Sequence, residues 1–344
     1  MTANNTYRAM QASRPGELEL VEREVPQPGP GEVLIAVEAC GICGADAGAI
    51  EGTERGAQFP RVPGHEVVGR IAAIGVGTPP TWAPGRRVGI GRLGGHCHAC
   101  EPCRRGWFNL CADQPTTGST RDGGYAEMMV ARSTGLVSIP DELDSVAAAP
   151  LLCAGIATFN ALRKSGAQAG DLVAIQGVGG LGHLAIQYAR RMGFKVVAVG
   201  RGSDIAADVI ALGAHIYVDA AAEDAAAALK RMGGADVILS TITDSAAASA
   251  LVPALAPQGR FMVIGVGREP LTVAPGLLVG AERVVRGAIT GTPYEAERTL
   301  AFSVLADVRA MIETLPLERA QEAYQRMRSG QARYRMVLTM EAGR

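Results

Sequence analysis

The sequence has almost no excess of charge of either sign. Its 33 basic and 34 acidic residues leave a net charge of −1 over 344 residues. Nucleic acids and anionic lipid surfaces attract proteins through basic patches, because the groups to be neutralised are phosphates. We therefore expect neither nucleic acid nor a membrane among the partners, and a small molecule as the substrate.

The sequence also lacks an apolar run long enough to cross a membrane, which takes about 20 residues. Residues 172–189 come nearest, but glycines and polar residues interrupt them. Residues 1–16 contain no apolar segment of the kind found in secretory signals. These absences predict a soluble protein in the cytoplasm.

Internal repeats and low-complexity linkers are missing as well. A chain of 344 residues is nevertheless too long for one ordinary hydrophobic core, which predicts two domains. Residues 7–90 contain short strands, among them 31–39 and 67–74, separated by turns rich in glycine and proline. Such a series is typical of a barrel-like β domain.

From about residue 141 the pattern changes to alternating helices and strands. We expect helices at 141–164, 181–192, 205–212 and 220–231, and strands at 171–176, 195–199, 215–218, 236–240 and 259–264. This alternation predicts a parallel sheet covered by helices on both faces. After about residue 290, a helix-rich tail ends in a strand at 335–340.

Seven cysteines, an odd number, are spaced unevenly along the chain. In a reducing compartment, clustered cysteines favour a metal over disulfides. One cluster has the spacing C-x2-C-x2-C-x7-C and comprises Cys97, Cys100, Cys103 and Cys111. Four thiolates this close together need a cation and leave no open coordination position, so they predict a structural zinc site. Disulfides or free thiols are the alternative.

A second set of metal-ligand residue types, Cys43, His65 and Cys153, is spread over three segments. Three protein ligands would leave a fourth position open for chemistry. Asp46 can accept the second imidazole proton of His65, and Glu66 can serve as an exchangeable ligand. The residues alone equally allow buried side chains and a surface carboxylate.

A glycine-rich turn lies between the strand at 171–176 and the helix that follows it. It matches G-x-G-x-x-G and comprises Gly177, Val178, Gly179, Gly180, Leu181 and Gly182. The glycines allow close backbone approach, and the start of the helix offers free N–H groups to a pyrophosphate. The turn therefore predicts a dinucleotide site, with a structural glycine turn as the alternative.

The second strand of this unit is followed by Gly200 and Arg201. NAD sites carry an acidic residue at this point to bind the ribose. Arg201 can instead pair with the 2′-phosphate of NADP, so NADP is the preferred cofactor. NAD is the alternative if Asp204 or Asp219 binds the ribose.

In this order, the three groups of residues resemble those of the zinc-containing medium-chain dehydrogenase/reductase family, in particular its alcohol dehydrogenases. The resemblance spans nearly the whole chain and implies an α/β fold. Residues 1–148 and 290–344 would form a GroES-like, β-rich catalytic domain with a structural zinc lobe at about 92–112. Residues 149–289 would form a Rossmann domain, a doubly wound parallel sheet that binds the cofactor. Members are commonly homodimers or homotetramers.

The resemblance also implies an activity: zinc-dependent, NAD(P)-dependent alcohol dehydrogenase or aldehyde reductase. Each subunit would hold two zinc ions, a structural one and a catalytic one bound by Cys43, His65 and Cys153, with Glu66 as an alternating ligand. Arg335 matches an arginine that reaches the cofactor pyrophosphate. The segment beside the nicotinamide corresponds to Ile264, Gly265 and Val266.

The chain departs from the family pattern close to the implied catalytic zinc. Ala45 replaces a hydroxyl residue that starts a proton relay, Gly48 replaces a frequent histidine, and Arg92 replaces a frequent aromatic. Ala45 and Gly48 carry no proton and leave room for a bulky or aromatic substrate. Arg92 either binds an acidic group of the substrate or forms a surface salt bridge.

The missing relay keeps a second activity open. Reduction of a conjugated C=C or C=N bond by NADPH on the same scaffold needs no hydroxyl relay, because the product proton can come from solvent.

Overall fold

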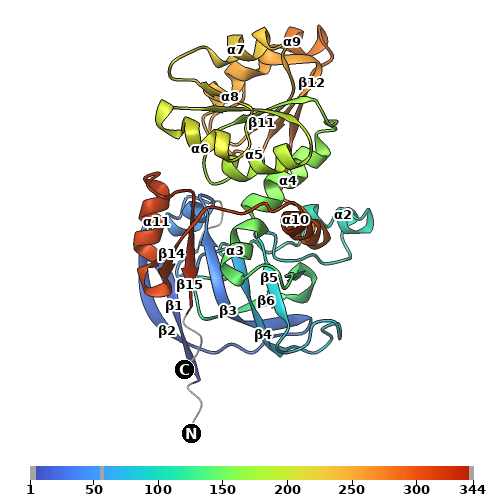
Figure 1. Cartoon of the computed structure of the whole chain (residues 1–344). Coiled ribbons are helices and arrows are strands. Elements are labelled where there is room, and N and C mark those ends of the chain that lie inside the picture. Colours follow the sequence, from blue (N-terminus) through green and yellow to red (C-terminus); the bar gives the residue numbers. More distant parts are fainter. Residues whose placement is uncertain (1–4, 55–57, 341–344) are drawn as a thin grey trace. The chain divides into compact units, whose positions relative to one another are not determined.

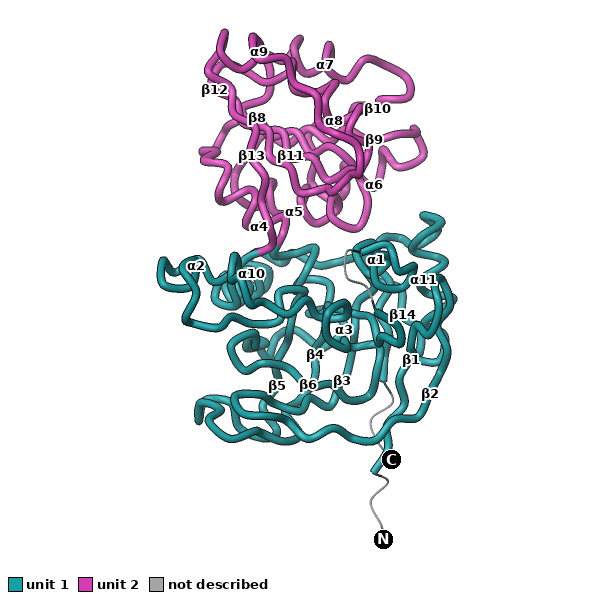
Figure 2. The backbone as a smooth tube through the Cα atoms, turned by 180° about the vertical axis from the view of Figure 1, so that it is seen from behind, with its two compact units in different colours: residues 1–156, 291–344 teal, residues 157–290 magenta. Residues whose placement is uncertain are grey.

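The computed structural model describes residues 5–54 and 58–340. Contacts divide the chain into unit 1, residues Met1–Ile156 and Gly291–Arg344, and unit 2, residues Ala157–Thr290 (Figures 1 and 2). Each unit has its own hydrophobic core. The chain thus leaves unit 1, forms unit 2 and returns to complete unit 1.

Unit 1 contains a two-stranded hairpin and a seven-stranded sheet in the order β14-β15-β3-β4-β5-β7, with β6 paired to β3. The strands are β1 (Thr6–Arg14), β2 (Glu17–Glu24), β3 (Glu32–Ile42), β4 (Glu66–Ile74), β5 (Arg87–Ile90), β6 (Met128–Arg132), β7 (Val137–Ser138), β14 (Ile312–Pro316) and β15 (Arg335–Thr339). The tail strand β15 pairs antiparallel with β3, with Leu338 opposite Cys40. The C-terminal segment therefore completes a sheet begun by the N-terminal one (Figure 1).

The helices of unit 1 are short except in the tail. They are α1 (Asp46–Ile50), α2 (Glu101–Arg104), α3 (Ser145–Ala148), α10 (Pro293–Leu305) and α11 (Ala320–Arg328). Helix α4 (Ala154–Lys164) includes the boundary between the units.

The single helix predicted over 141–164 is divided into α3, the 3₁₀ turn η3 (Ala149–Leu152) and α4. Pro150 cannot donate a helical hydrogen bond, and Cys153 leaves the helical region with φ −128° and ψ −74°. Because α3 and η3 contact β3 and β4, they belong to unit 1. The expected boundary at residue 148 thus falls before the observed end of this segment at Ile156.

Unit 2 is a six-stranded parallel sheet in the order β10-β9-β8-β11-β12-β13. Its strands are β8 (Leu172–Gln176), β9 (Lys195–Gly200), β10 (Ile216–Asp219), β11 (Ala235–Ser240), β12 (Leu255–Val263) and β13 (Val284–Gly287). Its helices are α5 (Gly182–Arg191), α6 (Ala206–Ala211), α7 (Ala225–Arg231), α8 (Ser245–Leu251) and α9 (Pro275–Val279). Figure 1 shows α5 and α6 on one face of this sheet and α7 and α8 on the other. The doubly wound order confirms the predicted fold class.

Sequence patterns missed four strands, β6, β7, β13 and β14, and placed one helix start too early. β13 is a short and largely exposed edge strand, so it has no apolar alternation to detect. The helix expected from residue 220 begins at Ala225, because Asp224 caps it by accepting from Ala226 N and Ala227 N.

The described residues include apolar helices, and their length bears on whether any could cross a membrane. No single helix there is both long and apolar enough to cross a bilayer, although the bent pair Ser145–Leu152 and Ala154–Lys164 meets that standard by length and composition alone.

Candidate metal centres and nucleotide pocket

The first cluster brings together Cys43, His65, Glu66 and Cys153. One ligand atom from each lies within 4.8 Å of the others, and all four residues are buried. Cys43 follows β3, and Glu66 opens β4, which pairs with β3 so that Gly41 lies opposite Glu66. The break in the helix at Cys153 brings in the remaining thiol. Sequence segments more than a hundred residues apart thus meet at one buried point.

The His65 ring is oriented by Asp46. Its Nδ1 lies 2.7 Å from Asp46 Oδ1, and both side chains are buried. Its Nε2 is buried and has no hydrogen-bond partner within residues 5–54 and 58–340. A buried polar atom without a partner is costly unless something binds it. The unpartnered Nε2, beside two thiols, therefore fits a zinc ion, which takes nitrogen and sulfur ligands of this kind.

Protonation of the metal-free cluster follows from burial and from the neighbouring charges. Burial disfavours the imidazolium of His65, but the carboxylate of Asp46 outweighs this effect and raises the pKa of His65 to about 10. The sulfurs of Cys43 and Cys153 lie 3.9 Å apart. A hydrogen bond from Cys153 lowers the pKa of the Cys43 thiol, and the same contact raises that of Cys153.

Glu66 forms a buried ion pair with Arg335 Nη2. Burial raises the pKa of Glu66 to about 7, although the positive charge of Arg335 opposes this shift. Glu66 Oε2 and Arg335 Nε are both buried and have no hydrogen-bond partner in the described part of the chain. Arg335, expected at the cofactor, is thus bound to Glu66 in unit 1 and keeps one donor unused.

The departures from the family pattern lie around α1. Ala45 is exposed, and its place in a substrate pocket stays a prediction. The space beside Gly48 is not empty, however: a Cβ there would lie 3.1 Å from the Cβ of Glu54 and 3.3 Å from its Oε2. The prediction that Gly48 enlarges the pocket is therefore wrong, because the Glu54 side chain occupies that room.

Arg92 is bound to the same glutamate. Arg92 Nη2 lies 2.6 Å from Glu54 Oε1, and Ser119 Oγ donates to Glu54 Oε2 at 2.7 Å. Both members of the ion pair are about three-quarters buried. Of the two expectations for Arg92, the structure shows the salt bridge. The charge of Arg92 is already neutralised, so we do not assign it to an acidic substrate group.

The second cluster holds the four closely spaced thiols in a loop that contains α2. Their sulfur atoms all lie within 4.8 Å of one another. Backbone N–H groups point at them: Cys97 N lies 3.4 Å from Cys111 Sγ, and Cys100 N lies 3.4 Å from Cys97 Sγ. Backbone hydrogen bonds lower the pKa of the Cys100 thiol to about 6. The geometry fits a tetrahedral zinc with no open position.

The glycine-rich turn of unit 2 is shaped by contacts with its own backbone. A Cβ on Gly182 would lie 1.9 Å from the carbonyl oxygen of Gly177, so only glycine lets α5 approach β8 this closely. Gly177 has φ +94°, which also favours glycine. Gly179 faces open space. In the described chain, the N–H groups of Gly179 and Gly180 make no backbone hydrogen bond, which fits a pyrophosphate in this position.

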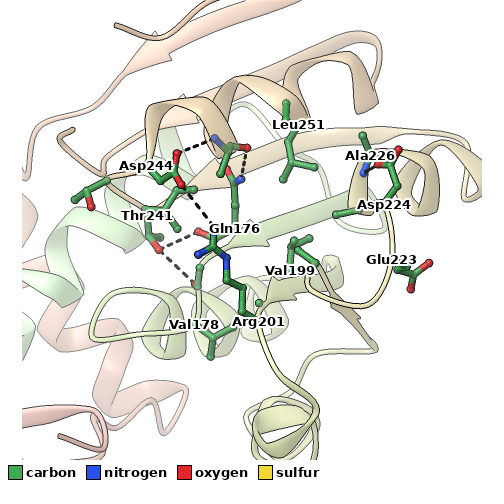
Figure 3. Close-up of a pocket in the computed structure, with 18 of the residues that line it drawn as sticks. Gln176, Val178, Val199, Arg201, Glu223, Asp224, Ala226, Thr241, Asp244 and Leu251 are labelled. Carbon is green, nitrogen blue, oxygen red and sulfur yellow. Dashed lines mark hydrogen bonds and ion pairs between the residues drawn. The ribbon is translucent and has the colours of Figure 1, made fainter. Parts of the chain in front are cut away.

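A cavity of about 750 Å³ in unit 2 begins at this turn (Figure 3). Gly177, Val178, Gly200 and Arg201 line it, together with residues of α7 and α8. Ile264, Gly265 and Val266 do not line it. Val266 lines a neighbouring hollow that shares Thr243 and Asp244 with it.

Tyr217 leaves no room for a side chain on residue 200. A Cβ on Gly200 would lie 2.9 Å from both Cε2 and the hydroxyl oxygen of Tyr217, whose hydroxyl donates to Gly202 O at 2.7 Å. A carboxylate cannot be placed at residue 200 without moving this ring. Asp219 Oδ1 already accepts from Gly202 N and Ala221 N. Neither Asp219 nor Asp204 lines the cavity.

Arg201 is the one cation among the described residues that line the cavity. Its Nη2 lies 3.5 Å from Asp244 Oδ2, and both side chains are largely exposed (Figure 3). Glu223 and Asp224 also line the cavity. An exposed ion pair of this length is weak, so Arg201 can exchange Asp244 for another anion.

The sequence missed three residues that shape these sites: Glu54, Tyr125 and Tyr217. Tyr125 and Tyr217 reach Asp46 and Gly200 from other segments, whereas Glu54 follows α1 closely. The spacing and composition of the sequence do not predict the contacts of Glu54 and Tyr217. The Gly123-Gly124-Tyr125 run was a visible signal, because glycines that precede a buried aromatic mark a close backbone approach.

Comparison with known proteins agrees with this geometry. The model of the alcohol dehydrogenase GroES-like domain matches residues 29–141, and that of the zinc-binding dehydrogenase domain matches residues 180–305. The chain is 39% identical to alcohol dehydrogenase patD of Penicillium expansum over 340 residues, which covers 98% of this chain and 99% of the relative. It is 34% identical to aldehyde reductase AdhA of Synechocystis sp. over 333 residues, covering 97% of this chain and 98% of the relative.

Among solved structures, a cinnamyl alcohol dehydrogenase of Sorghum bicolor superposes with a TM-score of 0.88 at 28% identity, covering 97% of each chain. The matches to both domain models and to relatives covered over nearly their whole length identify the family. The chain belongs to the zinc-containing medium-chain dehydrogenase/reductase family, the alcohol dehydrogenases and their relatives, and is an oxidoreductase.

Proposed function

We propose that the chain is a zinc-dependent alcohol dehydrogenase or aldehyde reductase that uses NADP(H) and acts on bulky or aromatic substrates. One observation carries the proposal: Cys43, His65 and Cys153 converge, and His65 Nε2 is buried with no partner among the described residues. These three residues would hold a catalytic zinc and leave room for a substrate oxygen. The four thiols of the loop would hold a second zinc, giving two per subunit.

Zinc would supply a Lewis acid for the alcohol or carbonyl oxygen, and the nicotinamide would supply or accept the hydride. The residues of the chain prepare that chemistry. Asp46 keeps the proton of His65 on Nδ1 and so presents Nε2 as a ligand. Cys43 and Cys153 would bind the zinc as thiolates, which requires Cys153 to lose its proton when the metal binds. Arg335 balances the charge of Glu66, and we propose that it also binds an oxygen of the cofactor.

The preference for NADP is supported by the residues after β9. Gly200 and Tyr217 together exclude the carboxylate that would bind a ribose hydroxyl, and Arg201 supplies a positive charge. NAD remains the alternative, because Asp244, Glu223 and Asp224 make the rest of the cavity acidic.

The substrate class is supported by Ala45, a small and exposed residue close to the ligands, and by the names of the relatives. These are an alcohol dehydrogenase, an aldehyde reductase and a cinnamyl alcohol dehydrogenase. A second candidate is reduction of a conjugated C=C or C=N bond. Neither Ala45 nor Gly48 can pass a proton, and Glu54, which lies beside Gly48, is bound by Arg92 and Ser119.

One experiment separates these activities. Purified protein is supplied with cinnamaldehyde and either NADPH or NADH, and the products are identified; a Cys43→Ser variant serves as the control. We expect the allylic alcohol with NADPH and little turnover by the variant. The saturated aldehyde would favour the second candidate, and faster turnover with NADH would contradict the cofactor assignment. A wild-type protein without zinc would contradict both.

A further inference from the structure

Tyr125 is a fully buried residue beside the Cys43, His65 and Cys153 cluster, and no step described above uses it. Its hydroxyl donates to Asp46 Oδ2 at 2.9 Å. Burial raises the pKa of Tyr125 well above its usual value, and the charge of Asp46 adds to this effect. The phenol therefore keeps its proton and acts as a hydrogen-bond donor.

Asp46 is held by three donors from three segments of the chain. Tyr125 and the backbone N–H of Cys43 donate to Oδ2, each at 2.9 Å, and Nδ1 of His65 lies 2.7 Å from Oδ1. The first two contacts leave Oδ1 aimed at the imidazole. If Tyr125 were absent, only one short backbone contact would hold Oδ2, and the carboxylate could turn away from His65.

The segment of Tyr125 is also joined to the segment that carries His65. Gly123 N donates to Val62 O, Gly124 N to Gly64 O and Tyr125 N to Pro63 O, at 2.7 to 3.0 Å. Gly64 has φ +98°, and a Cβ there would lie 2.3 Å from Cδ1 of the Tyr125 ring. The ring therefore packs directly against the backbone next to His65. One tyrosine fixes both the carboxylate and the approach to the histidine.

We propose that Tyr125 is a positioning residue of the catalytic metal site. It holds Asp46, and through Asp46 the imidazole of His65, in the orientation that presents Nε2 to zinc. This inference rests on the metal site of the proposed function. Groups that orient a metal-binding histidine typically change metal affinity by about 10- to 100-fold when they are removed.

The test is zinc affinity measured by chelator competition on the full chain. Tyr125→Phe removes one oxygen and keeps the ring. We expect the affinity of one of the two zinc sites to fall by about tenfold or more, with the other site unchanged. Tyr324→Phe is the matched control, because the buried Tyr324 also donates to a carboxylate, Glu51 Oε1, at 2.5 Å. It should leave both affinities unchanged.

A double-mutant cycle shows whether Tyr125 acts through Asp46. Asp46→Asn should itself weaken zinc binding, and adding Tyr125→Phe to it should cause little further loss. Full additivity would overturn the inference. So would an unchanged affinity in Tyr125→Phe if its melting temperature fell as in Tyr324→Phe, because the tyrosine would then be only structural.

The metal content of the wild type separates this inference from the proposed function. Two zinc ions per subunit and an unaffected Tyr125→Phe variant would overturn the inference alone. A single, structural zinc in the wild type would overturn both. If Tyr125→Phe did not fold, its structural zinc would be lost as well. The Asp46→Asn variant would then decide, since unchanged zinc affinity there would also overturn the inference.

Discussion

Gly200 and Tyr217 show how a contact between neighbouring strands limits which side chain can stand at the end of β9. The ring of Tyr217 occupies the place of a side chain on residue 200 and leaves no room for a ribose-binding carboxylate. Sequence alone identified the glycine but not the reason for it, because Tyr217 lies on the neighbouring strand β10. It likewise identified Asp46 as the partner of His65, a contact present in the structure at 2.7 Å.

Arg201→Ala is expected to weaken the binding of NADPH and to leave the binding of NADH unchanged. A hydrogen bond to a charged group contributes about 1.5–3 kcal/mol, so the KM for NADPH should rise by about tenfold or more. Steady-state kinetics with both cofactors measure the change. Arg191→Ala is the control, since that exposed arginine does not line the cavity. Equal losses with NADPH and NADH would contradict a 2′-phosphate contact.

At the scale of elements, the glycine turn before α5 has two structural roles: it allows close packing of the helix, and it leaves space for a ligand. Gly182 lets the helix lie against the end of β8, whereas Gly179 leaves space open beside the turn. The sequence pattern predicted the strand, the turn and the helix together, because glycine spacing and apolar periodicity are local signals. Strands β13 and β14 were missed, because both are short and mostly exposed or half-buried, so they show little apolar alternation.

Alanine at Gly182 should lower stability, whereas alanine at Gly179 should weaken cofactor binding. Gly182→Ala drives a methyl group into the Gly177 carbonyl, so it should lower the free energy of unfolding by about 1–3 kcal/mol, measured with urea. Gly179→Ala should unfold like the wild type but bind NADP more weakly, measured by calorimetry, because its methyl group projects into the phosphate space. The assignment of the turn fails if Gly179→Ala binds the cofactor normally.

At the scale of the whole molecule, both metal clusters belong to one unit. Every residue of the two clusters lies in unit 1, and the glycine turn lies in unit 2. Folding and metal binding are coupled wherever ligands come from separate segments. Cys43, His65 and Cys153 come from three such segments, so zinc should stabilise unit 1 in particular.

Zinc removal should therefore loosen the two units unequally. Hydrogen exchange after chelation is expected to rise in peptides that cover 40–54, 60–70 and 97–111, whereas peptides within 172–263 keep their protection. Adding NADP to the chelated protein should slow exchange around 177–205. Uniform loss of protection across the chain would contradict the separation of the two cores.

Strand β15 is translated long after the residues of both clusters. The seven thiol and imidazole groups of the two clusters lie between Cys43 and Cys153, whereas Arg335, which neutralises Glu66, opens β15. During synthesis the ribosome releases both ligand sets before the guanidinium exists. Until then Glu66 has no counter-charge from Arg335. Strand β15 thus sets the charge of a site whose other parts are translated before it.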